Sequence, residues 1–264
     1  MSAVMIEEYP MQLFETNMFK PFSQKDFNDR MHINQSAKYD MNDAAKSIGE
    51  LLKKHQLLDL LGVCNIHNHF HVNENEIIVA KTNAMNTVPS FDADVSSLNY
   101  VHLKATTLAA SVEKDSIPAT PYMWAYDKQS KMFFALQFFS GNQEMSNRFH
   151  RLAERSKNLL NFYQEFIELA GNLALEDILG IYLLYDDLLD ERRIHDEFYE
   201  TTNDEAREQW IYAKKLNVNQ KQNAAITHWA FSTDNNDVIQ VLCNAYCPKR
   251  SNGDHEGYLS HMKC

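Results

Sequence analysis

The sequence predicts a single α+β domain in which an antiparallel sheet of about six strands, formed by three β-hairpins, packs against three or four helices. Three pairs of β-rich runs, each pair joined by turn-forming residues, predict the hairpins, and a long helical block lies between the second and third pairs. The chain has 264 residues, 44% of them hydrophobic, which is enough for one sizeable core. Because there is no internal repeat or obvious linker, we expect residues 1–264 to form one domain, with an irregular N-terminal segment over residues 1–38.

The strands are assigned from apolar residues that alternate with polar ones, which is the period of a pleated strand. One face of the first strand would carry the side chains of Cys64, Ile66, Phe70 and Val72. The three hairpins are expected over residues 64–72 with 76–80, 122–126 with 132–139, and 226–231 with 238–243.

The helices are assigned from apolar residues at helical spacing. Gly62 would end the first helix, and Thr202 begins a capping-box pattern that would open the last one. The helix after Gly171 should be buried, because its first half is almost continuously apolar. These helices are expected over residues 42–61, 147–170, 173–196 and 202–216, and a further short one is compatible with residues 96–111.

Charge and cysteine content limit the possible surroundings of the protein. The 25 lysines and arginines are outnumbered by 36 acidic residues, giving a formal charge of −11. That balance disfavours binding to nucleic acid or to an anionic membrane surface. Four unevenly spaced cysteines do not make a disulfide framework, and the N-terminus lacks a signal-peptide pattern. We expect a soluble, cytoplasmic protein with reduced thiols, although a protein exported without a cleaved leader would share these features.

The strongest candidate site is a histidine cluster formed by His67, His69 and His71. Alternate residues of a strand share a face, so the three imidazoles would converge. Such a set suits a divalent transition metal (Zn²⁺, Fe²⁺ or Cu²⁺), with Glu74 or Glu76 as a further ligand or as the general base. The alternative is a polar strand face, or buried histidines that only form hydrogen bonds.

A second candidate lies near the C-terminus, where Cys243 and Cys247 are followed by His255 and His261. Two thiolates and an imidazole can bind zinc tetrahedrally. The alternative is a pair of buried thiols at a strand end. If the third hairpin lay beside the first, His228 or Cys243 would come close to the histidine cluster, and Cys243 would join its ligands. By contrast, Cys64 is expected on the apolar face, where burial makes a thiol unreactive.

Two short stretches resemble motifs of known families. Gly62, His67–His69 and Glu74 resemble the first motif of the cupins, over about a dozen residues, but the second cupin motif is absent and the chain has only 7 glycines. Residues 186–190 resemble the magnesium-diphosphate motif of terpenoid synthases. The alternative for this acidic run is a solvated helix end, and the predicted hairpins do not fit an all-α synthase. Neither family is assigned.

Two functions remain open from the sequence. The first is a metal-dependent enzyme acting on a small molecule, in which zinc would polarise water, or iron or copper would activate dioxygen. The second is a non-catalytic interaction or regulatory protein with structural histidines, which should expose an apolar patch to a protein partner. In either case residues 1–38 and 82–120 are expected to border the histidines, because loops over a sheet usually carry the binding site. The oligomeric state is left open.

Overall fold

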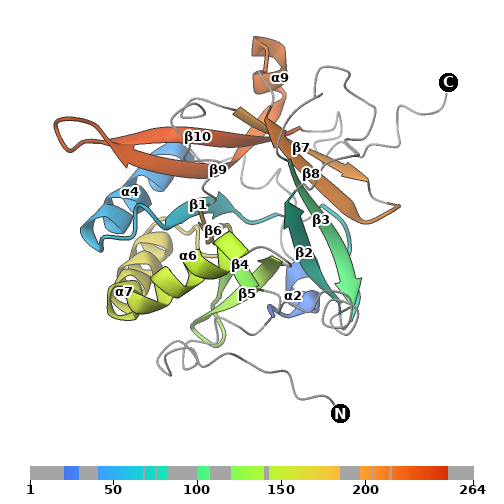
Figure 1. Cartoon of the computed structure of the whole chain (residues 1–264), viewed down its shortest axis with the longest axis horizontal. Coiled ribbons are helices and arrows are strands. Elements are labelled where there is room, and N and C mark those ends of the chain that lie inside the picture. The colour runs from blue at the N-terminus through green and yellow to red at the C-terminus, as the bar shows by residue number, and fades with distance from the viewer. Residues whose placement is uncertain are drawn as a thin grey trace.

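A computed structural model of the protein describes residues 21–29, 41–67, 69–74, 76–82, 100–107, 120–139, 143–184, 197–203, 205–213 and 216–248. Within these ranges there are ten strands and five helices (Figure 1). The helices are α2 (Gln24–Asp29), α4 (Met41–Lys54), α6 (Gln143–Glu154), α7 (Ser156–Asn172) and α9 (Val218–Gln222). The strands are β1 (Leu61–Asn65), β2 (Glu76–Thr82), β3 (Tyr100–Thr107), β4 (Thr120–Asp127), β5 (Met132–Phe139), β6 (Leu179–Leu183), β7 (Glu197–Asn203), β8 (Glu208–Ala213), β9 (Ala224–Thr233) and β10 (Ile239–Pro248).

The strands form a closed mixed barrel in the order β1-β6-β4-β5-β2-β3-β8-β7-β10-β9. The pairs β2–β5 and β7–β10 are parallel. The ring closes where Val63 and Cys64 of β1 pair with Trp229 and His228 of β9. The predicted antiparallel sheet of about six strands is therefore wrong. Short apolar runs have the same sequence pattern in parallel and antiparallel sheets, and this pattern does not reveal which distant strands pair.

The first predicted hairpin does not form. β1 pairs with β6 and β9, whereas β2 pairs with β3 and β5. Strand β1 ends at Asn65, and the histidine-containing stretch that follows is not a strand. Its apolar side is nevertheless buried as predicted: Ile66 is 3% exposed, Phe70 8% and Val72 4%.

The second and third predicted hairpins are confirmed, as β4–β5 and β9–β10. An aspartate carboxylate organises each turn. Asp127 accepts a hydrogen bond from the backbone N–H of Ser130 at 2.9 Å, and Asp234 accepts one from Val238 at 2.9 Å. Such local side-chain bonds are encoded within a few residues, which is why the sequence reveals these hairpins.

The predicted helix over residues 42–61 corresponds to the shorter α4. It ends at Lys54 because Gln56 adopts a left-handed conformation with φ 57° and the N–H of Leu57 bonds to the carbonyl of Leu52 at 2.8 Å. The amphipathic stretch 147–170 forms parts of two helices, α6 and α7.

Three other helix predictions are wrong. The apolar run after residue 173 contains the buried strand β6, and Ala174, with φ 55°, turns the chain after α7. The capping-box pattern at Thr202 lies in a β-hairpin of β7 and β8, because the Asn203 side chain accepts from the N–H of Ala206 at 3.0 Å and forms a turn instead. Residues 100–107, inside the possible short helix, form strand β3.

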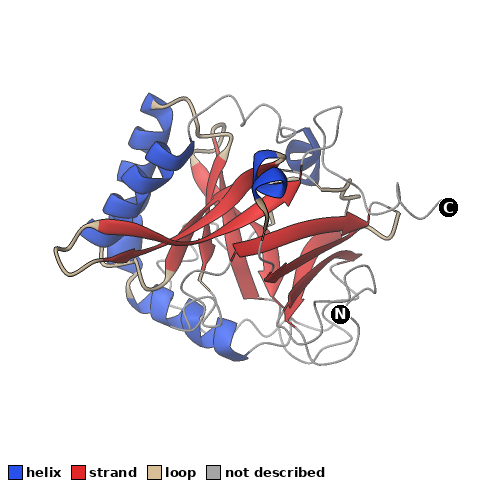
Figure 2. Cartoon of the chain, turned by 90° about the horizontal axis from the view of Figure 1, so that it is seen from above, coloured by secondary structure: helices blue, strands red, loops and turns tan. Residues whose placement is uncertain are grey.

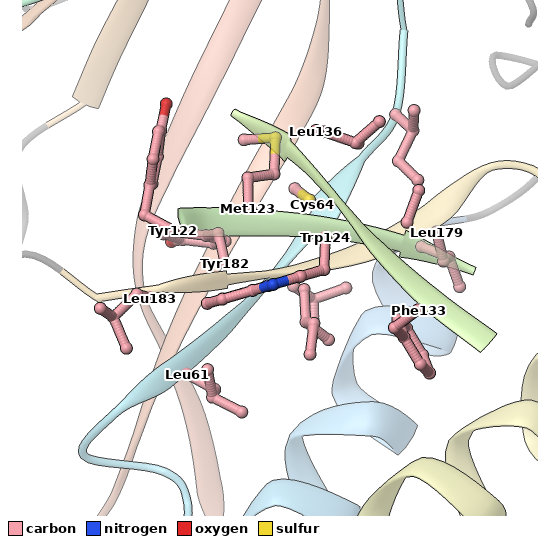
Figure 3. Packing of buried hydrophobic residues seen from close by; sticks show 14 of the residues in the cluster. Leu61, Cys64, Tyr122, Met123, Trp124, Phe133, Leu136, Leu179, Tyr182 and Leu183 are labelled. Atoms are coloured by element: carbon pink, nitrogen blue, oxygen red, sulfur yellow. The ribbon is translucent and has the colours of Figure 1, made fainter. Parts of the chain in front are cut away.

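Helices α4, α6 and α7 cover one side of the barrel (Figure 2). Phe133 of β5 stacks on Tyr163 of α7, with ring centroids 4.2 Å apart, and Trp124 of β4 packs against Phe149 of α6. Figure 3 shows Phe133 directed toward the helices, while Leu136, farther along β5, lies away from them. No helix in the described ranges is long and apolar enough to cross a membrane.

Gly62 does not end a helix but lies inside β1. A Cβ atom there would come within 2.5 Å of Tyr182 Cε1, so only glycine leaves room for this ring. The Tyr182 ring in turn packs edge-on against His228, with centroids 5.0 Å apart. The glycine therefore helps to position a histidine of the candidate site.

Candidate metal centre

The site is built around Glu200, whose side chain is fully buried. Glu200 lies in the middle of β7, where alternate residues face the interior, and its neighbours Phe198 and Thr202 on that face are buried too. A buried carboxylate is costly unless polar groups surround it. The groups that contact Glu200 therefore determine the chemistry available in this part of the barrel.

Two of the predicted histidines meet at one oxygen of Glu200. Oε2 lies 3.4 Å from His67 Nε2 and 3.0 Å from His69 Nε2. The two rings are 4.6 Å apart between centroids. That is closer than the roughly 7 Å between alternate residues of a strand, because the segment leaves the extended conformation after Asn65.

Hydrogen bonds orient both rings. His67 Nδ1 lies 2.7 Å from the Asn65 carbonyl, which can only accept, so this nitrogen carries a proton. His69 Nδ1 lies 2.7 Å from Thr202 Oγ1, and its Nε2 lies 2.8 Å from the Gln209 amide nitrogen. Both Nε2 atoms then face the carboxylate of Glu200, and the partner of each Nδ1 holds the ring in place, as is typical of metal-ligating histidines.

The other oxygen of Glu200 contacts β9. The hydroxyl of Thr227 donates a hydrogen bond to Oε1, and His228 Nδ1 lies 3.4 Å from the same oxygen. Adjacent residues of a strand usually point to opposite faces, but here the β9–β10 register passes from His228 to Ile226 and skips Thr227. This bulge allows both side chains to reach Glu200.

Cys247 completes the group. The parallel register of β10 with β7 aligns Tyr246 with Tyr199, which places Cys247 beside Glu200. Burial, together with the negative charge of Glu200, raises the pKa of the Cys247 thiol well above its usual range. Donor atoms of His67, His69, Glu200 and Cys247 all lie within 4.8 Å of one another.

The charge state of the group follows from its contacts. Burial alone would raise the pKa of Glu200, but hydrogen bonds from His228, His67 and His69 outweigh it and hold the pKa well below its usual range. Burial lowers the pKa of His69. The site thus combines an ionised carboxylate with a neutral imidazole, both of which can donate electron pairs to a metal.

A small cavity borders the group. About 20 Å³ of it is accessible to water, which is room for at least one molecule. His67, His69, His228 and Gln209 are among its walls, and so is Phe27 from the N-terminal segment. Residue 27 belongs to the stretch 1–38 expected at the histidines. The other stretch expected at the histidines is 82–120, and the structure does not describe the side chains of its residues 100–107.

The remaining predicted site residues lie elsewhere. His71 is exposed, with Nε2 3.5 Å from Asn28 Nδ2, and Glu74 is exposed. Glu76 binds Arg207, whose Nη2 donates to Oε1 at 2.8 Å, and this hydrogen bond lowers the pKa of Glu76. None of these three belongs to the group around Glu200.

Several other sequence candidates fall outside what the structure describes. These are the side chain of Cys243, the two downstream histidines His255 and His261, and the acidic run 186–190. Burial raises the pKa of the Cys64 thiol, as predicted for an unreactive cysteine. The sequence interpretation missed Glu200 and its supports Thr202, Thr227 and Gln209, and the only local signal was the alternation of Phe198, Glu200 and Thr202.

No family model, curated protein or solved structure matches this chain.

Proposed function

We propose that this protein is a metal-dependent enzyme that binds a divalent transition metal through His67, His69, Glu200 and Cys247 and acts on a small molecule in the adjoining cavity. The observation that supports this most is the convergence of four donors within 4.8 Å, with Nε2 of both imidazoles facing the buried carboxylate of Glu200. Where imidazole nitrogens lie this close to a carboxylate, either a proton or a metal ion can be held between them.

The donor set favours Zn²⁺. Nitrogen, oxygen and sulfur ligands together suit this ion, and bonds of about 2.0–2.3 Å in a tetrahedron put the donors about 3.3–3.8 Å apart. The separation of His67 Nε2 from Glu200 Oε2, 3.4 Å, is already in this range, and that of His69, 3.0 Å, is close to it. The wider separations, up to 4.8 Å, require a modest contraction on binding. Iron and copper also accept such ligands.

The chemistry follows from the metal and the cavity. Zinc lowers the pKa of a bound water to about 7 and can accept a fifth ligand during a reaction. The cavity lies beside His67 and His69 and has room for that water. Metal-assisted hydrolysis or hydration is therefore the reaction class we propose.

The alternative is a non-catalytic protein whose histidines only hold the barrel together. Such a protein should expose an apolar patch. Among the described residues the exposed large apolar side chains are Met132, Leu173, Val218 and Val238, which come from four different parts of the chain. This distribution does not support a patch built on one element.

The proposal is tested with untagged full-length protein. Metal content is measured by mass spectrometry and Zn²⁺ affinity by competition with a chelator. His67→Ala and His69→Ala should each lower the affinity more than about a hundredfold. His71→Ala is the matched control, since it removes an exposed histidine of the same segment, and should leave the affinity unchanged. Equal affinity in all three variants, or no stoichiometric metal in the wild type, would favour the non-catalytic alternative.

The role of Cys247 has a separate readout. Co²⁺ bound to a thiolate gives an intense charge-transfer band in the near ultraviolet. We expect this band in the Co²⁺-loaded protein and its loss in Cys247→Ser. Cys64→Ser is the control, because Cys64 is equally buried but does not belong to the donor group.

A further inference from the structure

The cavity beside the metal centre has two kinds of wall. One kind is apolar and consists of Phe27, Ile66, Met123, Leu136 and Ile211. The other carries side-chain amides, from Asn65, Gln137 and Gln209. No lysine or arginine is among the described residues that line it. A ligand in this cavity therefore meets apolar surface, amides, the imidazole of His228 and the metal centre, but no lysine or arginine from these walls.

The loaded centre itself would carry no net charge. The carboxylate of Glu200 and the thiolate of Cys247 cancel the two positive charges of the ion, and the imidazoles are neutral. An anionic ligand entering the cavity would lose its hydration without gaining a lysine or arginine as its partner, which is costly. A neutral ligand avoids this cost.

One amide is placed to bind such a ligand. The hydroxyl of Tyr122 donates to Gln137 Oε1, which leaves the Nε2 end of this amide to donate toward the cavity. By contrast, the Gln209 amide is engaged by His69 and Glu200. A ligand with one hydrogen-bond acceptor matches these walls.

Two side chains are shared between the walls of this cavity and those of a second one of similar size. Phe27 and Leu136 line both, and the second cavity is otherwise largely apolar, with Phe22, Ile78 and Phe138 in its walls. In Figure 3 Leu136 and Met123, which both line the cavity beside the metal centre, lie on the side away from the helices. Removing the Phe27 ring would therefore join the two spaces into one longer apolar pocket.

The ring of Phe27 is held in place by its neighbours in α2. Asn28 pairs with the backbone of Val72 in both directions: its Nδ2 donates to the carbonyl at 2.7 Å and its Oδ1 accepts from the N–H at 2.9 Å. Gln24 Nε2 donates to the Glu76 carbonyl at 2.8 Å. These bonds attach α2 to the segment that carries the histidines, so the partition is part of the folded structure.

We infer that the cavity takes a small uncharged ligand with one hydrogen-bond acceptor, and that Phe27 limits the length of this ligand by closing the way into the second cavity. This inference rests on the proposed function, because the ligand is held next to the bound metal. It assigns the residue that sets ligand size to the N-terminal segment, outside the group that binds the metal.

The test uses the Co²⁺-loaded full-length protein, whose visible absorption changes when a further ligand reaches the metal. The probes are N-methylimidazole and N-hexylimidazole, which are neutral ligands of different length, together with acetate and phosphate. In the wild type N-methylimidazole should give a saturable change, N-hexylimidazole should bind more weakly, and the two anions should give none. Phe27→Ala should strengthen N-hexylimidazole binding about tenfold and leave N-methylimidazole unchanged, because the added space accommodates the chain.

Phe22→Ala is the matched control. Phe22 lines only the second cavity, so its removal leaves the partition intact and the ligand series as in the wild type. Phe27→Leu, which keeps an apolar side chain, replaces Phe27→Ala if the smaller residue prevents folding. It should strengthen N-hexylimidazole binding by a smaller factor.

Each outcome has a distinct meaning. If acetate or phosphate binds as tightly as N-methylimidazole, the inference that the ligand is uncharged is wrong. If N-hexylimidazole still binds more weakly than N-methylimidazole by the wild-type factor in both Phe27 variants, the inferred role of Phe27 is wrong. In either case the proposed function would still hold if Co²⁺ binding is lost when His67 or His69 is replaced. If Co²⁺ binding does not depend on these histidines, the proposed function fails and this inference fails with it.

Discussion

Glu200 and Glu76 are both buried carboxylates with lowered pKa values, but their surroundings differ. A hydrogen bond from the guanidinium of Arg207 is the main reason for the lowered pKa of Glu76. Glu200 overcomes a larger cost of burial through hydrogen bonds from His228, His67 and His69. A permanent cation satisfies the first carboxylate, whereas the second is surrounded by groups that can themselves coordinate a metal. A low pKa alone therefore does not identify a functional carboxylate, and the chemistry of its partners does.

Exchanging each carboxylate for an amide should separate the two roles most clearly. Glu200→Gln removes an anionic ligand and should lower Zn²⁺ affinity more than about a hundredfold. Glu76→Gln should leave that affinity within about twofold, because Glu76 is bound to Arg207 and is not in the donor group. Chelator competition measures both. Similar losses in the two variants would show that the carboxylates act together.

The support of His69 provides a smaller test of the same site. Thr202→Val keeps the shape of the side chain but removes the hydroxyl that forms a hydrogen bond with His69 Nδ1. Outer supports of metal ligands usually contribute 10–100-fold to affinity, and we expect about tenfold here. Thr201→Val, at the preceding position of β7, is the control and should change the Zn²⁺ affinity little. No difference between the two variants, measured by the same competition, would remove Thr202 from the site.

The pair formed by Glu76 and Arg207 should contribute to stability but not to metal binding. Arg207→Gln leaves the buried Glu76 carboxylate without its cation and should lower the free energy of unfolding by about 1–2 kcal/mol. The side chain of Arg207 is 32% exposed, which keeps the effect below that of a fully buried pair. Lys128→Gln breaks an exposed pair with Asp177 and should cost less than about 1 kcal/mol. Urea unfolding of the metal-free proteins compares them.

The same pair predicts a dependence on pH. The pKa of Glu76 is lower in the folded protein than its ordinary value of 4.5, so its stabilisation is fully present above that value. It is lost as the pH falls through the lowered pKa of the folded state. The difference in unfolding free energy between the wild type and Arg207→Gln should therefore shrink from neutral to acidic pH. A difference that stays constant in urea titrations at a series of pH values would contradict this.

The sequence predicts the parts of this fold that depend on neighbouring residues. The hairpins β4–β5 and β9–β10 have turns fixed by Asp127 and Asp234 over a few positions. The helix predicted after residue 173 is wrong because the fully buried strand β6 has a continuous apolar run, which a buried helix shares. Periodicity alone does not separate the two.

The candidate site was only partly predictable for a related reason. His67 and His69 stand close together in the sequence, but Thr202, which supports His69, is 133 residues away from it. Glu200 belongs to no short motif, and its burial depends on the pairing of β7 with β8 and β10. The bulge that brings Thr227 to Glu200 is a property of the β9–β10 register, which single residue types do not reveal.

The closure of the barrel between β1 and β9 bears on how the molecule folds and opens. Only Val63 and Cys64 are paired across this seam, so its amide hydrogens should exchange with solvent sooner than those of the longer β9–β10 ladder. His67 follows β1 directly, whereas Cys247 lies on β10 beyond β9. An ion bound to both would cross-link the seam and close a loop that spans most of the chain, a contact that forms slowly because the two ends must first find each other. Metal binding should then act as a late step of folding that slows the opening of the barrel.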